Sequence, residues 1–471
     1  MKHRKAKTVE RSQSKLSRTA RASNEPDEVL QGPGFIMARK GRLIHIEATA
    51  TEEEHRAMLK SLSESRSDLE ADIERQVAEL EAIISEYDPF DIISNIWLAN
   101  TIINPETYCE YEHEGKEAYA EYVALLCLTR PYHESQERIV PGPIIEDVNN
   151  RIEALFRTVI VHLIAKDIPP DGQPLGDTLH ELRFNTIGRS LIVRYPGYQH
   201  HQESTVRGIC SPLNTHLTKI LGFDIEDALA IAHGVGDMLS RRINDRIEQS
   251  RGSRHKLLKE VKRYRQKKRS KGSELSPELL EQLAKMKPSQ SKQNLTNLLI
   301  TWTFFAFGDT LSFTAEELAN ETGRDTNRIR ACLESMSLEF GAVEPRYRVP
   351  SPTYPLMAHP FIRRGDRFFC PVPNSILWSI RPALEGRLNP ASPVAASGTD
   401  SSVWEQYQQA RSDYLEARSM ELLNKALRHT ESYRNLEYDS VDNGQVVQAE
   451  LDGMLFFDSA LFTHLTQRGE N

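Results

Sequence analysis

Apolar residues recur at helical spacing over much of the chain. From Glu52 to Tyr87 they form one stripe with charged residues elsewhere, which predicts a long amphipathic helix. The stripe comprises Leu62, Leu69, Ile73, Val77, Leu80 and Ile84. Sustained heptads are lacking, which favours a core-facing helix over a dimer seam. Before it, residues 34–48 alternate around Lys40-Gly41 and predict a small hairpin.

A second helical region follows. Asp88-Pro89 supplies an N-cap and a first-turn proline for a helix carrying Ile92, Ile93 and Ile96. Further helical patterns cover 116–128, 145–166 and 224–250. Residues 88–250 are therefore expected to form one helical domain.

The pattern changes again over residues 296–386. A capping threonine, Thr314, with Glu317 three residues later starts a helix, and Gly323 separates it from a second helix that begins near Asp325. Two apolar stretches, 360–362 and 368–369, flank a charged turn and predict a hairpin. Helix, turn, helix and hairpin together resemble a winged helix. Arg324, Arg328 and Arg330 are its candidate DNA-contacting residues, and a purely protein-binding scaffold remains the alternative.

Composition narrows the class of protein. The chain has 471 residues and is 39% hydrophobic, enough for two to four domains with buried cores. The longest apolar run, Leu298–Phe307, falls short of the ~20 residues that cross a bilayer, so no membrane partner is expected. The N-terminus is basic without an apolar stretch behind it, which excludes a secretory signal and predicts a cytoplasmic protein. The five cysteines form no CxxC pair, which predicts reduced and mostly buried residues.

Charge is distributed unevenly. The net charge of −8 discourages nucleic-acid binding as a property of the whole chain, but residues 251–271 contain a single acidic residue, Glu260. This block is either a solvated helix and tether or a segment that contacts phosphates. Its candidate nucleic-acid-binding residues are Lys262, Arg263, Arg265, Lys267, Lys268 and Arg269.

Common catalytic motifs are absent from the sequence. His180 opens an HExxH-like sequence, but Phe184 occupies the place of the second histidine. The neighbouring His200 and His201 favour a surface loop over a metal site, because adjacent residues seldom point at one ion. No GxxxxGK[ST], GxGxxG or GxSxG sequence occurs.

The C-terminal residues carry the clearest chemistry. A helix from Val403 to about Arg428 places Glu416 in line with Met420. Two strands follow, separated by a turn at Asp442-Asn443-Gly444, and the second carries Glu450-Leu451-Asp452-Gly453 before an apolar run; a third begins at Leu461. This order resembles the PD-(D/E)XK nucleases, in particular their nuclease-related, NERD-like branch. The resemblance covers about the last 65 residues.

The resemblance implies a metal-dependent phosphodiesterase. In that family an aspartate on one strand and a glutamate on the next strand hold Mg²⁺. A lysine two residues after the glutamate polarises the attacking water. Here Asp452 would be the metal ligand and Glu416 an accessory carboxylate. The family's glutamate and lysine positions hold Leu465 and Gln467, so the ExK motif is missing. Efficient cleavage is therefore not expected, and Mg²⁺ binding should be weak or absent.

The short tail leaves several explanations open. The chain would be a C-terminally truncated nuclease-family protein, by frameshift or as one piece of a split enzyme, and a protein partner would complete its sheet. Replacement of the missing groups by Glu470 or Arg468 has the wrong spacing. The alternatives are a nucleic-acid-binding protein without catalysis, with DNA as the preferred ligand, and a helical scaffold.

The predicted fold class is mostly α with small α+β parts. It combines a helical N-terminal domain, a winged-helix-like middle module and an incomplete restriction-endonuclease-like α/β core. The expected segments are a basic disordered arm over 1–33, hairpin and long helix over 34–87, the helical domain 88–250, a basic helix and linker over 251–295, the winged-helix-like module 296–386, a linker over 387–402, and the truncated nuclease-like core 403–471.

Overall fold

The computed structural model describes most of the chain. The described residues are 28–32, 35–40, 43–48, 51–101, 116–168, 198–267, 275–397, 399–427, 431–442, 445–457 and 460–464. These residues are mostly helical, as the sequence predicts, with small sheets. None of the described helices is both long and apolar enough to cross a membrane. The chain divides into two compact units, one of residues 1–67 and 163–181 and one of residues 68–162 and 182–471.

The first unit contains a three-stranded antiparallel sheet and a helix. Strands β2 (Phe35–Lys40) and β3 (Leu43–Ala48) form the predicted hairpin, and β1 (Glu28–Gly32) adds to it from the segment expected to be the basic arm. Helix α1 (Glu52–Glu64) starts with a capping box in which Thr51 and Glu54 exchange hydrogen bonds.

The predicted long helix is two helices. Helix α1 ends with its C-cap at Ser65, and the chain continues directly into α2 (Arg66–Ile84). The buried residues of α2 are Ile73, Val77, Leu80 and Ile84. The apolar stripe thus predicts the buried face correctly, while a single residue interrupts the helix.

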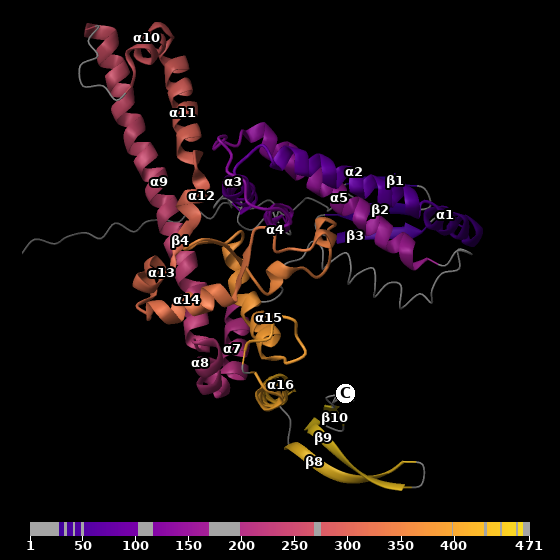
Figure 1. The fold of residues 1–471 in the computed structure, drawn as a ribbon. Coiled ribbons are helices and arrows are strands. Elements are labelled where there is room, and N and C mark those ends of the chain that lie inside the picture. The colour runs from indigo at the N-terminus through magenta and orange to yellow at the C-terminus, as the bar shows by residue number, and fades with distance from the viewer. Residues whose placement is uncertain are drawn as a thin grey trace, which may run out of the picture. The chain divides into compact units, whose positions relative to one another are not determined.

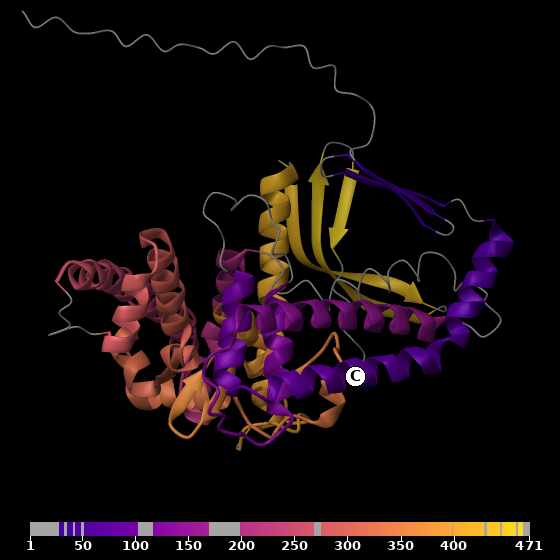
Figure 2. The ribbon, with the colours of Figure 1, turned by 90° about the horizontal axis from the view of Figure 1, so that it is seen from above.

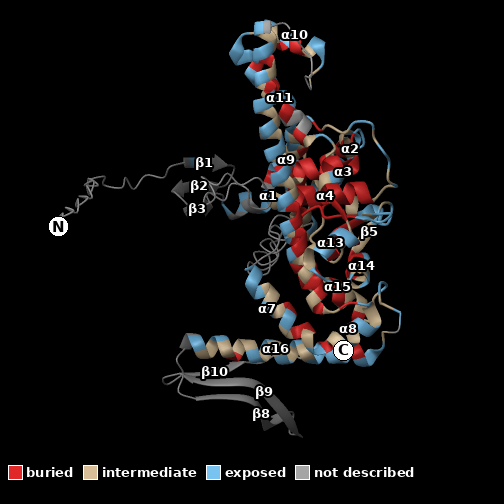
Figure 3. Ribbon diagram, turned by 90° about the vertical axis from the view of Figure 1, so that its left-hand side faces the viewer, coloured by how far each residue is buried: buried red, intermediate tan, exposed pale blue. Residues whose placement is uncertain are grey.

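Helices α3 and α4 lie at the centre of the second unit. Helix α3 (Pro89–Thr101) begins where Asp88 accepts a hydrogen bond from the Phe90 amide at 3.0 Å, as the Asp-Pro pair predicts. Helix α4 (Glu117–Leu128) is buried along almost its whole length (Figure 3). The other long helices of this region are α5 (Gly142–Asp167), α7 (Gln199–Cys210), α8 (Asn214–Leu221) and α9 (Ile225–Lys267).

The buried carboxylate of Asp91 joins α3 to the short helix α12 (Phe307–Leu311). The Asp91 carboxylate is fully buried, accepts the Gly308 amide at 2.7 Å and pairs with Arg138. Burial raises the pKa of Asp91, and the Arg138 guanidinium opposes that rise. The hydrogen bond from Gly308 to Asp91 links two backbones that approach closely at Gly308.

Residues 307–369 form helices around a four-stranded mixed sheet. Its strand order is β4-β7-β6-β5, with only the β5–β6 pair parallel. Along the chain, helices α13 and α14 follow β4 and precede β5. Strands β6 and β7 form the predicted hairpin, which turns at Gly365 with a φ of 62°. The bounds are β4 Ser312–Thr314, α13 Ala315–Thr322, α14 Thr326–Ser335, β5 Ser337–Glu339, β6 Phe361–Arg364 and β7 Arg367–Phe369.

The segment expected to be a linker is held by hydrogen bonds. Helix α15 (Ile376–Leu388) ends near Arg387, whose carbonyl accepts the Ala396 amide at 2.9 Å. The chain then enters α16 (Ser401–Leu427), where Tyr407 is fully buried and donates to Glu385 at 2.6 Å.

The C-terminal elements follow the predicted order of one helix and three strands. After α16 come β8 (Glu431–Asp442), β9 (Gln445–Phe457) and β10 (Ala460–His464), which form an antiparallel sheet in the order β10-β9-β8. Strand β9 contacts α16, and Figure 2 shows the helix and strands in the yellow end of the chain.

Candidate nucleic-acid interface

The helical arm is residues 251–304, made of the C-terminal part of α9 with α10 (Pro277–Lys285) and α11 (Pro288–Phe304). Figure 1 shows α9 and α11 side by side with α10 near their common end. A hydrophobic cluster holds the three helices together. It comprises Leu257, Val261, Leu280, Leu283, Leu295 and Leu299. The described part of the basic block, up to residue 267, is therefore one side of a packed structure, and α9 runs without interruption to Lys267.

The polar side of α9 in the arm carries most of the exposed cations. Lys259, Lys262 and Arg263 are exposed, and within the described residues they make no ion pair. Together with His255, Lys256 and Gln266 they define the basic face, all six of whose residues are exposed. At 3.6 residues per turn these six positions fall within an arc of roughly 120°.

Arg265 points the other way. Its Nη2 donates to the carbonyl oxygens of Met286 at 2.9 Å and Leu283 at 3.0 Å, and its Nε donates to that of Ala284 at 3.1 Å. It also donates to Ser291, which is 2% exposed. Arg265 thus satisfies the last carbonyls of α10 and ties three helices together. The sequence grouped it with the phosphate-contacting candidates, but its guanidinium is used within the arm.

Three further candidates of the basic block lie at or beyond the limit of description. Helix α9 ends at Lys267, of which the structure describes the backbone but not the side chain. Lys268 and Arg269 lie outside the described residues.

The candidate arginines of α14 are paired with carboxylates. Arg328 Nη2 lies 2.5 Å from both Asp224 Oδ2 and Asp227 Oδ2, and its Nε is 2.7 Å from the latter. Burial alone would raise the pKa of Asp224, but the hydrogen bonds and charge of Arg328 lower it overall. The side chain of Asp227 is 1% exposed, so this contact is an interior one.

The other two arginines near α14 also have acidic neighbours. Arg324 Nη1 lies 3.7 Å from Asp227 Oδ1, and Arg330 pairs with Glu316 of α13. Helix α14 also contacts α8 and α9. All three arginines thus have a carboxylate neighbour, in the interior for Arg328 and at the surface for Arg330.

The two candidate metal ligands lie on neighbouring elements. Glu416 is half-buried on α16, where Ser412 donates to its carboxylate at 3.0 Å, and Met420 one turn on is buried. Asp452 lies on β9, which contacts α16, and its side chain is outside the described part. Among the described residues no three His, Cys, Asp or Glu side chains are grouped as metal ligands would be.

The remaining sequence candidates give no catalytic arrangement. His180 and Phe184 lie outside the described residues. His200 and His201 stand exposed in the first turn of α7, with ring centroids 4.1 Å apart, rather than in the expected loop.

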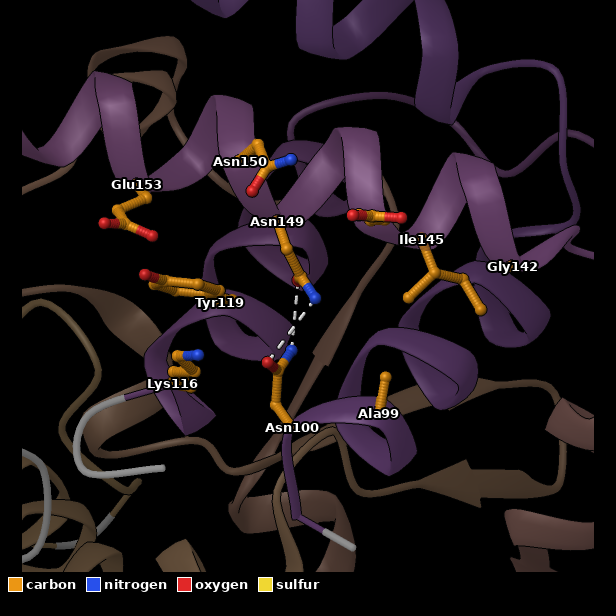
Figure 4. Close-up of a pocket in the computed structure, with 10 residues that line it drawn as sticks. Ala99, Asn100, Lys116, Tyr119, Gly142, Ile145, Asn149, Asn150 and Glu153 are labelled. Atoms are coloured by element: carbon orange, nitrogen blue, oxygen red, sulfur yellow. Dashed lines mark hydrogen bonds between the residues drawn. The ribbon is translucent and has the colours of Figure 1, made fainter. Parts of the chain in front are cut away.

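One cavity was not predicted from the sequence. It has a volume of about 410 Å³ and lies between α3, α4 and α5. Asn100, 3% exposed, donates to Asn149 at 3.1 Å across it, and Figure 4 shows the two amide groups facing each other. Lys116, Tyr119, Glu146 and Glu153 also line it. The sequence gives little sign of this cavity, because the pairing of Asn100 with Asn149 depends on how α3 and α5 pack in the folded chain.

Comparisons with known proteins add no relative. No family model matches the chain, and neither a curated protein nor a solved structure matches it.

Proposed function

We propose that this chain binds nucleic acid through the phosphate backbone and that the basic face of the helical arm is the contact surface. The supporting observation is the exposure of Lys259, Lys262 and Arg263 without acidic partners among the described residues. Of the chain's 59 Lys and Arg and 67 Asp and Glu, the arm holds 14 and 4. An acidic protein that concentrates cations in one arm, four of them on one helix face, is suited to a polyanionic ligand.

The finer fold is consistent with this proposal. The order β4, α13, α14 and the β6–β7 hairpin, with β4 paired to β7, resembles a winged helix. In its second helix, α14, Arg328 forms ion pairs with Asp224 and Asp227, and Arg330 forms one with Glu316. We therefore assign phosphate contact to the arm rather than to α14.

Charge reversal on the basic face tests the proposal. A Lys259→Glu, Lys262→Glu, Arg263→Glu variant is expected to lose at least about tenfold in affinity for DNA at physiological salt, because three phosphate contacts become repulsive. Fluorescence anisotropy with a labelled DNA measures this loss.

The matched control reverses three cations outside the arm. Arg157, Lys219 and Arg346 are exposed, and their reversal to glutamate is expected to change affinity less than threefold by the same assay. Equal losses in the two variants would show a general charge effect and would contradict the arm as the contact surface. Failure of the full chain to bind any nucleic acid would favour the helical scaffold.

A second candidate is descent from a PD-(D/E)XK nuclease, with Glu416 and Asp452 left from its Mg²⁺ site. The observation that favours it is the order α16, β8, β9, β10 with antiparallel pairing throughout. In the β9–β10 register Gly453 pairs with His464, so a group facing Asp452 must follow one residue later, where the sequence has leucine.

Restoration of the missing groups tests this second candidate. A chain carrying Leu465→Glu and Gln467→Lys, extended by an apolar strand, is expected to cleave DNA with Mg²⁺, since an i, i+2 pair shares one strand face. A further Asp452→Ala change should abolish the cleavage. A well-folded restored chain that stays inert would exclude the nuclease relation.

A further inference from the structure

The basic face has a composition that selects among nucleic acids. Its six residues, His255, Lys256, Lys259, Lys262, Arg263 and Gln266, are polar or cationic, and none is tyrosine, tryptophan or phenylalanine. Proteins that hold single strands stack bases on such aromatic side chains. The aromatic residue of this part of α9, Tyr264, is half-buried against the hydrophobic cluster of the arm. The basic face therefore offers charge without a stacking platform.

The geometry of the face is regular. The helical rise of 1.5 Å per residue puts Lys259 and Arg263 about 6 Å apart along the axis, and the whole face from His255 to Gln266 about 16 Å long. That length equals roughly five base pairs at 3.4 Å each. A duplex presents one phosphate charge per ~1.7 Å, the densest regular row of anions that a nucleic acid offers to such a helix.

The opposite side of the helix keeps this face in place. Arg265 holds the carbonyls of Leu283, Ala284 and Met286, and Leu257 and Val261 are buried in the cluster. The cations therefore project from a packed scaffold, and little ordering of the backbone is needed when a ligand binds.

Resting on the proposed function, we infer that the ligand of the arm is a double helix held by its phosphates without regard to base sequence. Base reading requires several bidentate side chains that enter a groove, whereas three of the four cations of the face are lysines, which act as point charges. The shared chemistry is that of duplex DNA and duplex RNA.

The test compares ligands on the full chain by anisotropy. Two duplex DNAs of unrelated sequence are expected to bind within threefold of each other, and a single strand of equal length at least about tenfold more weakly, because stacking is missing. A duplex RNA of the same sequence is included, and whichever duplex binds more tightly identifies the source of the ligand. Tighter binding of the single strand, or a sequence preference above tenfold, would overturn the inference and leave the proposed function standing.

Salt dependence gives a second readout on the duplex. The slope of log affinity against log salt should become shallower by about 2.7 in the Lys259→Glu, Lys262→Glu, Arg263→Glu variant, at 0.9 per phosphate contact. An unchanged slope would contradict backbone contact by this face. Vesicles rich in anionic lipid are the competing polyanion, and binding to them without binding to any nucleic acid would remove both the inference and the proposed function.

Discussion

Replacement of Gly308 by alanine is expected to lower the free energy of unfolding by about 2–4 kcal/mol, because overpacking strains a close contact between two backbones. A methyl group there would lie 2.5 Å from Phe90 Cβ, 2.6 Å from the Phe90 carbonyl carbon and 2.9 Å from the Asp91 nitrogen. Backbone atoms cannot move aside as a flexible side chain can. Equilibrium denaturation in urea measures the change.

The control for Gly308 is a helical glycine with free space. Gly236 lies in α9, and a methyl group there would meet nothing within 4 Å. Gly236→Ala is expected to stabilise the protein by up to about 1 kcal/mol through helix propensity. If Gly308→Ala were as stable as Gly236→Ala, the close approach of α12 to α3 would be refuted.

Loss of Asp227 is the second change with a large expected effect. Asp227→Ala should destabilise the protein by about 2–4 kcal/mol, because it removes charged hydrogen bonds and a helix cap although Arg328 keeps its contact with Asp224. The carboxylate receives Arg328 and also accepts the Asp224 amide at 3.0 Å, while Asp224 accepts the Asp227 amide at 3.1 Å. These reciprocal bonds cap the start of α9, so the substitution removes an interior contact and a helix cap together. Thermal or urea unfolding measures the loss.

A matched position on the same helix separates burial from charge. Asp237 is exposed on α9, and Asp237→Ala is expected to change stability by no more than about 0.5 kcal/mol. Similar losses at positions 227 and 237 would show that the Arg328 contact contributes little.

The lowered pKa of Asp224 makes stability depend on pH. The stabilising contribution of its carboxylate is present above the unfolded-state pKa of about 3.9 and is lost as the pH falls further. Asp224→Asn should flatten this acid-side decline.

The elements of the middle module follow from local signals. Thr314 and Glu317 exchange the predicted capping hydrogen bonds, and Gly323 ends α13 with a φ of 66°, a conformation that other residues rarely adopt. What this region of sequence does not reveal is the partner of each arginine. Arg328 meets a carboxylate that is 101 residues away in the chain, and no local pattern contains that information.

Helix length and side-chain direction explain the other differences. No proline interrupts residues 225–267, and α9 continues past the predicted end at 250 through Gly252. Arg265 could have been separated from Lys262 and Arg263 by its angular position, because it falls outside the roughly 120° arc of the basic face. The composition of 387–402 predicts a flexible connection, but a few backbone hydrogen bonds around Arg387 suffice to order it.

Helix α9 belongs to two parts of the second unit at once. Its first half packs on α13 and α14, its second half forms the helical arm, and no loop divides its 43 residues. An α-helix of this length spans about 65 Å and bends only gently unless its hydrogen-bond ladder is broken. The arm therefore has no loop to rotate about, and under the proposed function a duplex bound at one end of α9 would keep a fixed orientation relative to α13 and α14 near the other end.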